Sequence, residues 1–178
     1  FAVHDAQIMA EYLLKVMGYP AENVVIMLND KATRSDFDKY LGRWLKNNVE
    51  KDSSLFIYYS GHGAPNPVTG DAYLVPYDGD PSFIDDTGYS LKRLYEQLGR
   101  LPAGKIIVAL DSCFSGAGGR SVLAKGARPL VMNIQSSYLL PENVTVFAAA
   151  GSSQVSSTYQ EKSHGLFTYF MLKGIKEA

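Results

Sequence analysis

The chain has 178 residues and a formal net charge of −1 at pH 7, with 46% hydrophobic and 20% charged residues. This length suits one domain, and the composition excludes disordered, collagen-like and transmembrane classes. No run approaches the roughly 18 apolar residues of a membrane span, and the balanced charge makes nucleic acid an unexpected partner. One cysteine, Cys113, excludes a disulfide framework and leaves either a buried thiol or a reactive one.

Three elements are predicted in the first quarter of the chain. Helical spacing of apolar residues predicts a helix over residues 6–17, ended by Gly18. A short apolar run rich in β-branched residues predicts a buried strand over residues 23–28. Ser35 is then expected to cap a second helix. The apolar side of that helix consists of Phe37, Leu41, Trp44 and Leu45.

The rest of the chain alternates between strands and helices. Buried-strand patterns occur at residues 54–59 and 105–110, with a helix capped by Ser90 between them. A further strand is predicted at residues 144–148, before a helix near residues 165–175. This alternation predicts one α/β domain with a mostly parallel sheet and helices on both faces.

Two of these strands run into polar clusters that contain a histidine and the cysteine. Ser60-Gly-His62-Gly63 follows the first strand, and Asp111-Ser-Cys113 follows the second. Because the carboxyl ends of parallel strands meet at one rim, we expect His62 and Cys113 to share a cleft. The imidazole would take the thiol proton, and the resulting thiolate would attack an acyl carbon. The N–H groups of Gly63 and Cys113 are expected to hold the oxyanion.

Other interpretations of these residues remain open. A lone cysteine after a strand is commonly an inert core residue, and the same holds for a lone histidine. The pairing of the two at strand ends, each beside glycine, favours the catalytic interpretation. His4 and His164 have no comparable setting and are expected to be structural or surface residues.

The two polar clusters also carry a family resemblance. Residues 59–63 (YSGHG) and 111–116 (DSCFSG) resemble the two catalytic motifs of caspase-like cysteine peptidases, most of all metacaspases and their bacterial relatives. Residues 4–6, 71–76 and 164–169 are similar to the same family. The resemblance implies a caspase–hemoglobinase fold, a Cys-His dyad and protein or peptide substrates. The strand that opens the family's fold is missing here, so we expect a fragment or a chain that has lost its N-terminal part.

The resemblance also divides the chain into parts, one of which contains candidate sites of self-cleavage. The Gly-rich stretch 116–141 is expected to be an exposed excursion. Its basic residues Arg120, Lys125 and Arg128 are either sites at which the enzyme cuts itself or ordinary residues of a solvated loop. Within a single peptidase domain over 1–178, the expected parts are a large-subunit-like part (1–118), the excursion (119–142) and a small-subunit-like part (143–178).

By the same resemblance, Asp5, Ser60 and Asp111 match the pocket that receives the residue before the scissile bond. Caspases that cut after aspartate carry glutamine where Asp111 stands, and an acidic pocket would select Arg or Lys instead. The alternative is that Asp5 caps the first helix and Asp111 only hydrogen-bonds a loop.

Metacaspases often bind calcium through four aspartates, and three of these positions match Asp71, Asp85 and Asp86. The fourth position corresponds to Arg120 in this chain, and the positive charge of its side chain would repel a divalent cation. We therefore predict no metal and no cofactor, with calcium activation as the open alternative. A rival function is a caspase-like scaffold that lacks activity and serves as a binding or regulatory module.

Overall fold

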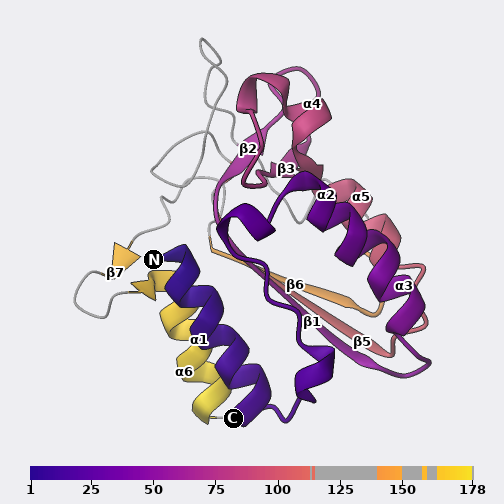
Figure 1. Ribbon diagram of the computed structural model, residues 1–178, viewed down its shortest axis with the longest axis vertical. Helices are drawn as coiled ribbons and strands as arrows, with labels where there is room; N and C mark the ends of the chain where they lie inside the picture. Colours follow the sequence, from indigo (N-terminus) through magenta and orange to yellow (C-terminus); the bar gives the residue numbers. More distant parts are fainter. Residues whose placement is uncertain (113, 115–139, 150–157, 160–163, 178) are drawn as a thin grey trace.

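The computed structural model describes residues 1–112, 114, 140–149, 158–159 and 164–177. Its main sheet is parallel and has the order β1-β5-β6 (Figure 1). These strands are β1 (Ser54–Ser60), β5 (Lys105–Asp111) and β6 (Val144–Ala148). The three strands predicted at 54–59, 105–110 and 144–148 are thus confirmed. The predicted excursion lies outside the described residues except for its last few positions.

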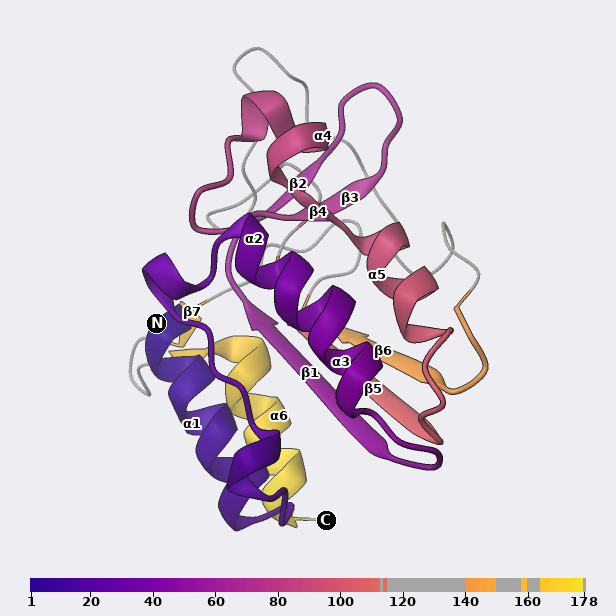
Figure 2. The same cartoon turned by 45° about the vertical axis from the view of Figure 1, so that its right-hand side comes forward.

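Helices cover both faces of this sheet, as predicted (Figures 1 and 2). One face packs against α1 (Ala2–Lys15) and α6 (Leu166–Glu177). The other face packs against α5 (Leu91–Leu98) and one continuous helical stretch. That stretch comprises α2 (Arg34–Phe37), the π-helical η3 (Asp38–Trp44) and α3 (Leu45–Asn48). Among the described helices, none is long and apolar enough to cross a membrane.

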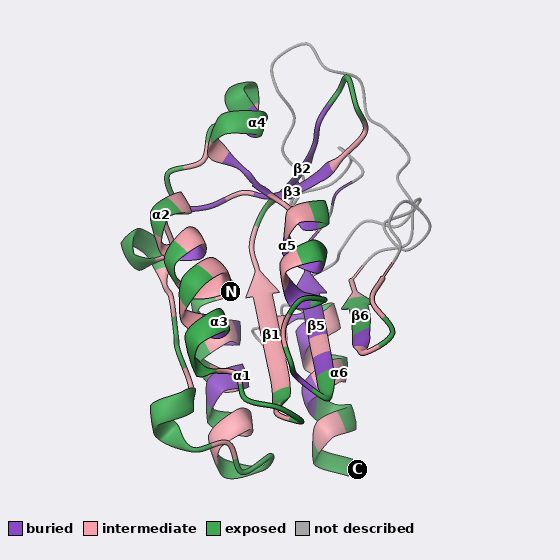
Figure 3. Ribbon diagram, turned by 90° about the vertical axis from the view of Figure 1, so that its right-hand side faces the viewer, coloured by how far each residue is buried: buried purple, intermediate pink, exposed green. Residues whose placement is uncertain are grey.

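Strand alternation divides the side chains of the sheet between these two helical layers. Ile106, Val108 and Leu110 of β5 are fully buried in the core shared with α5 and the α2–α3 stretch. Side chains at the intervening positions point to the opposite face, because successive residues of a strand alternate. Asp111 therefore points toward α6. Figure 3 shows buried residues concentrated along β5 and the inner side of α5.

The predicted strand over residues 23–28 is wrong. The segment lies between two short 3-10 turns, η1 (Ala21–Asn23) and η2 (Asn29–Lys31), and forms no strand. A groove of about 540 Å³, lined by α1, residues 24–29 and β1, separates the segment from the nearest sheet edge. Without a strand to pair with, the apolar run is not buried on both sides, and Val25 and Ile26 are 38% and 47% exposed.

The helix boundaries also differ in detail from the prediction. The first helix begins at Ala2 instead of residue 6, and the chain leaves it through Gly18, whose φ of 73° suits glycine. The second helix is capped by Thr33 and not by Ser35. The Thr33 hydroxyl accepts from the backbone N–H of Asp36, and the Asp36 carboxylate accepts from the backbone N–H of Thr33. This capping box satisfies two backbone N–H groups at the start of the helix. Ser35 lies within the helix and is therefore not in the capping position.

The sequence analysis missed two small antiparallel sheets. The first consists of β2 (Gly63–Pro65), β3 (Ala72–Leu74) and β4 (Tyr89–Ser90), with η4 (Pro81–Phe83) and α4 (Ile84–Thr87) between its last two strands. The second pairs β7 (Thr158–Tyr159) with β8 (His164–Gly165). Strands of two or three residues are too short for alternation to be visible in the sequence.

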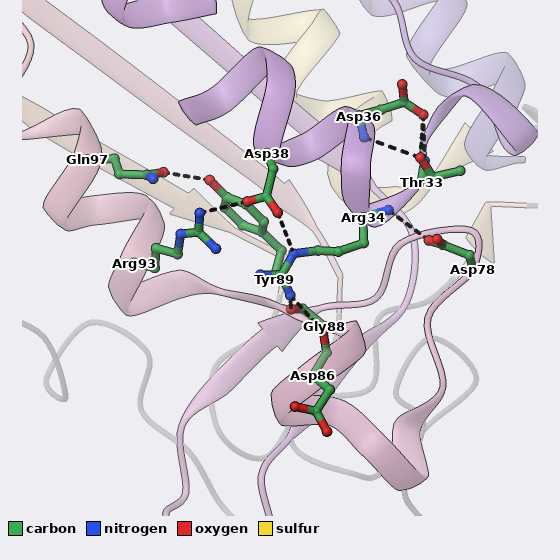
Figure 4. A network of polar contacts seen from close by, with 10 residues as sticks. All are labelled: Thr33, Arg34, Asp36, Asp38, Asp78, Asp86, Gly88, Tyr89, Arg93 and Gln97. Carbon is green, nitrogen blue, oxygen red and sulfur yellow. Dashed lines mark hydrogen bonds and ion pairs between the residues drawn. The ribbon is translucent and has the colours of Figure 1, made fainter. Parts of the chain in front are cut away.

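A polar network ties the first small sheet to the helical layer (Figure 4). The Arg34 guanidinium donates to the carbonyl oxygens of Gly88 and Asp86, just before β4. Asp38 links Arg34 to Arg93 of α5, with its carboxylate 2.7 Å from the Arg93 guanidinium. Tyr89 lies between the two arginines, and its burial raises the pKa of its hydroxyl to about 12. The network thereby anchors the sheet that begins at Gly63.

Candidate active site

The two predicted motifs meet at paired strand ends. Ser60, the last residue of β1, lies opposite Asp111, the last residue of β5. The Gly61 N–H then donates to the Asp111 carbonyl oxygen across 3.4 Å. His62 follows two residues after β1 and is exposed. Cys113 follows two residues after β5 but lies outside the described residues.

The backbone of His62 is held in place while its side chain faces solvent. Its carbonyl oxygen accepts from the Val75 N–H at 3.0 Å and from the Tyr59 hydroxyl at 2.7 Å. Burial raises the pKa of that hydroxyl, so it stays protonated and can donate. Gly61 permits this contact, because a Cβ there would lie 2.6 Å from the Tyr59 hydroxyl oxygen. Gly63 is buried and opens β2.

Asp111 is fully buried and joins the sheet to α6. Its Oδ2 accepts from the Thr168 hydroxyl at 2.6 Å. The Tyr58 hydroxyl lies 2.6 Å from the same Thr168 oxygen. Because the Thr168 proton points to the carboxylate, Tyr58 is the donor in the second bond. Burial raises the pKa of Tyr58, which keeps this donor protonated.

Asp5 is also fully buried, and it joins α1 to β8. Its Oδ1 lies 2.7 Å from His164 Nδ1, and its Oδ2 accepts from the Gly165 N–H at 3.0 Å. The charges of Asp5 and Asp111 both add to the rise in the pKa of Tyr58, behind burial as the main cause. The structure therefore brings the two predicted pocket carboxylates to the same side of the sheet, around one tyrosine.

Ser60, the third predicted pocket residue, lies at the same strand end. Its hydroxyl oxygen is buried, and a hydrogen bond between Ser60 and the Tyr58 hydroxyl partly offsets the rise that burial causes in the pKa of Tyr58. Ser112, which precedes Cys113, is 1% exposed, and its hydroxyl oxygen has no hydrogen-bond partner among the described residues. Most buried polar groups in folded proteins are hydrogen-bonded, so the Ser112 hydroxyl stands out among the described residues.

Two of the three aspartates matched to a calcium site, Asp71 and Asp85, accept hydrogen bonds from other side chains. Both Asp85 oxygens accept from the Asn66 side-chain amide, at 2.7 and 2.8 Å, and the Tyr73 hydroxyl donates to Oδ1. The Asp71 carboxylate accepts from Thr69. Within the described residues, Asp71, Asp85 and Asp86 form no group of converging metal ligands, and Arg120 lies outside them.

Three hydrogen bonds of the candidate site were missed by the sequence analysis. The Tyr58 hydroxyl donates to Thr168, which donates to the Asp111 carboxylate. His164 forms a hydrogen bond with Asp5, a partner that the expectation of a structural or surface residue did not name. Only the similarity of residues 164–169 to the family pointed to this region. A single Thr or His on an apolar helix or a short strand carries no periodic signal of such a contact.

A model of the caspase domain matches residues 2–178. The chain belongs to the caspase domain family. This confirms the resemblance seen in the two motifs, and it makes the chain a caspase-like peptidase domain.

Among curated proteins, this caspase domain is similar to metacaspases of fungi. It is 28% identical over 130 residues to metacaspase-1A of Aspergillus oryzae, a match that covers 65% of this chain and 30% of that protein. It is 29% identical over 131 residues to metacaspase-1 of Cryptococcus neoformans, covering 64% and 28%. The matched part thus spans about a third of the length of these relatives.

A solved structure shares the fold of nearly all of this chain. The crystal structure of a protein from Geobacter sulfurreducens superposes with a TM-score of 0.69 at 18% identity, covering 98% of this chain and 72% of that one. The predicted caspase-type α/β fold is therefore confirmed.

Proposed function

We propose that this chain is a cysteine endopeptidase that hydrolyses peptide bonds through a dyad of His62 and Cys113. The observation that carries the proposal is the parallel pairing of the two motif strands, with Ser60 opposite Asp111. Each dyad residue follows its strand end by two positions, which favours their meeting above one rim of the sheet. Membership of a peptidase family supports the same chemistry.

The proposed reaction follows from the two side chains. His62 takes the proton of the Cys113 thiol, and the thiolate attacks the carbonyl carbon of the scissile bond. The imidazolium then protonates the leaving amine, and a water molecule hydrolyses the acyl-enzyme. Backbone N–H groups of Gly63 and Cys113 stabilise the oxyanion. The anchored backbone and exposed ring of His62 support this role, since a fixed base must still reach substrate.

For specificity, we propose a preference for Arg or Lys before the scissile bond. Asp5 and Asp111 place two carboxylates on one side of the sheet at its carboxyl end, and Ser60 adds a buried hydroxyl. A guanidinium is attracted to such a site because charge-assisted hydrogen bonds strengthen in a low-dielectric setting. Since both carboxylates are 0% exposed, the pocket has to open when the basic side chain enters.

Turnover of a fluorogenic peptide panel tests this proposal. The peptides differ only in the residue before the bond, which is Arg, Lys, Leu or Asp. We expect Arg and Lys peptides to be cut about 10- to 150-fold more efficiently than the Leu peptide, the range that a charge-assisted contact provides. The Asp peptide should be cut least of all, because like charges repel in the pocket. Equal cleavage after Asp and Arg would refute the pocket assignment.

We further propose that the enzyme processes itself in the excursion 119–142. Three basic residues there match the proposed specificity: Arg120, Lys125 and Arg128. Incubated wild-type protein should yield two fragments whose new C-terminus is one of these residues, and the Cys113→Ala variant should stay intact. Mass spectrometry of the fragments identifies the cut. Wild-type protein that remains intact while cutting arginyl peptides would show that processing does not occur.

The rival function, an inactive binding module, predicts a Cys113 thiol of lower reactivity. In a working dyad, His62 raises the thiolate fraction of Cys113, and the thiol reacts rapidly with iodoacetamide at neutral pH. An inert core thiol reacts slowly. Rapid labelling that slows in His62→Ala supports the peptidase, whereas slow labelling of wild-type protein favours the module.

A further inference from the structure

The first turn of α1 and the short strand β8 bring together three side chains that commonly bind metals. His4 and Asp5 come from α1, and His164 comes from β8, 159 positions further along the chain from Asp5. The start of α1 lies beside this small sheet in Figure 1. One potential ligand atom from each of the three residues lies within 4.8 Å of the others. Within the described residues, this is the single group of its kind.

The geometry centres on one carboxylate oxygen. Asp5 Oδ1 lies 2.7 Å from His164 Nδ1 and 4.0 Å from His4 Nδ1. The two imidazole rings lie against each other, with centroids 4.8 Å apart. The other oxygen of Asp5 is held by the Gly165 N–H at 3.0 Å, which orients Oδ1 toward the imidazoles. Such a hydrogen bond behind a ligand is a usual support of metal sites.

We propose that His4, Asp5 and His164 bind one divalent transition-metal ion, such as zinc or cobalt. Two imidazole nitrogens and one carboxylate oxygen form a donor set that these ions favour, with water at the remaining position. Bonds of about 2.0 to 2.2 Å place ligand atoms roughly 3.3 Å apart in a tetrahedral site. The ion takes the place of the proton between His164 and Asp5.

The exposure of the three residues suits the entry of an ion from solvent. The His4 side chain is 50% exposed and the His164 side chain 17%, whereas Asp5 is fully buried beneath them. We expect His4 to be the ligand that moves, because its exposed side chain has room to rotate toward Asp5. The buried carboxylate is the fixed anchor.

The site has a consequence for substrate binding, and this step rests on the proposed function. Asp5 is one of the two carboxylates assigned to the pocket for Arg or Lys. A metal ion on Asp5 offsets its negative charge and occupies its Oδ1. The ion and a basic substrate side chain therefore compete, so metal binding selectively weakens the binding of substrates with Arg or Lys before the bond.

Cobalt titration of the Cys113→Ala variant tests the site without any catalytic readout. This variant lacks the thiol, so visible cobalt absorption reports on nitrogen and oxygen ligands alone. We expect one cobalt ion per chain. Adding His4→Ala should weaken cobalt binding at least about tenfold. Loss of a group that only hydrogen-bonds to a ligand already weakens metal binding about 10- to 100-fold, and loss of the ligand itself should weaken it more. His4 is half-exposed, so this change leaves the core intact, and His164→Ala provides a second variant.

The matched control is His62→Ala in the same Cys113→Ala background, which removes a histidine outside the group. It should leave cobalt binding unchanged. Cobalt binding that is absent, or that is insensitive to both His4→Ala and His164→Ala, overturns the metal site while leaving the peptidase proposal in place.

A competition arm separates the metal site from the pocket. An arginyl peptide should weaken apparent cobalt binding to the Cys113→Ala variant, and the same peptide with Leu in place of Arg should not. Cobalt binding that depends on His4 but ignores the arginyl peptide would support the metal site and overturn the competition, and with it the assignment of Asp5 to the pocket.

Discussion

Replacing Cys113 with alanine is expected to lower kcat for an arginyl peptide at least about 1,000-fold, because the change removes the nucleophile itself. His62→Ala should lower kcat nearly as much, because the two residues act as one catalytic unit and the effects of removing each do not add. The double variant should then be no slower than either single one. Initial-rate kinetics on the three variants measures this.

The fold has to survive these changes for the result to be informative. The His62 side chain is exposed, and its backbone carbonyl makes the contacts with Tyr59 and Val75. His62→Ala should therefore unfold at nearly the wild-type temperature. A Cys113→Ala protein that keeps wild-type turnover would overturn the dyad. A variant that loses both turnover and cooperative unfolding is replaced by Cys113→Ser, in which the weaker hydroxyl nucleophile should still lower turnover strongly.

Asp111→Asn is expected to lower kcat/KM for an arginyl peptide about 10- to 150-fold, which corresponds to the loss of a charge-assisted contact of about 1.5 to 3 kcal/mol. The asparagine oxygen can still accept the hydrogen bond from the Thr168 hydroxyl, so the network with Tyr58 keeps its acceptor. The change therefore removes the charge and leaves the shape. Cleavage of the leucyl peptide should change little.

Two further measurements distinguish a pocket defect from a general one. Alkylation of Cys113 by iodoacetamide should proceed at nearly the wild-type rate in Asp111→Asn, because the dyad is untouched. The matched control is Asp52→Asn, the same loss of charge at an exposed position before the opposite end of β1. If Asp52→Asn weakens arginyl cleavage as much as Asp111→Asn does, the effect is one of overall charge and the pocket assignment is wrong.

The elements that the sequence predicted well are those whose signal is local. Leu91, Leu94, Tyr95 and Leu98 repeat at helical spacing behind the cap Ser90, and all four are buried in α5. The strands β1, β5 and β6 have continuous apolar runs, as expected for strands covered on both faces. The same rule failed at residues 23–28, because an apolar run becomes a strand only where a neighbouring strand supplies hydrogen bonds. The sequence does not show that a groove separates this run from β1.

For the candidate site, the sequence by itself determined the two motifs, their place at strand ends and the family to which they belong. Tertiary structure alone decided what surrounds the two acidic residues. Asp111 meets Thr168 across 57 positions, and Asp5 meets His164 across 159. Neither partner can be read from spacing, because periodicity records which face of an element is buried and not which distant element covers it. Hydrogen bonds between buried groups depend on that packing, so these contacts exist only in the folded chain.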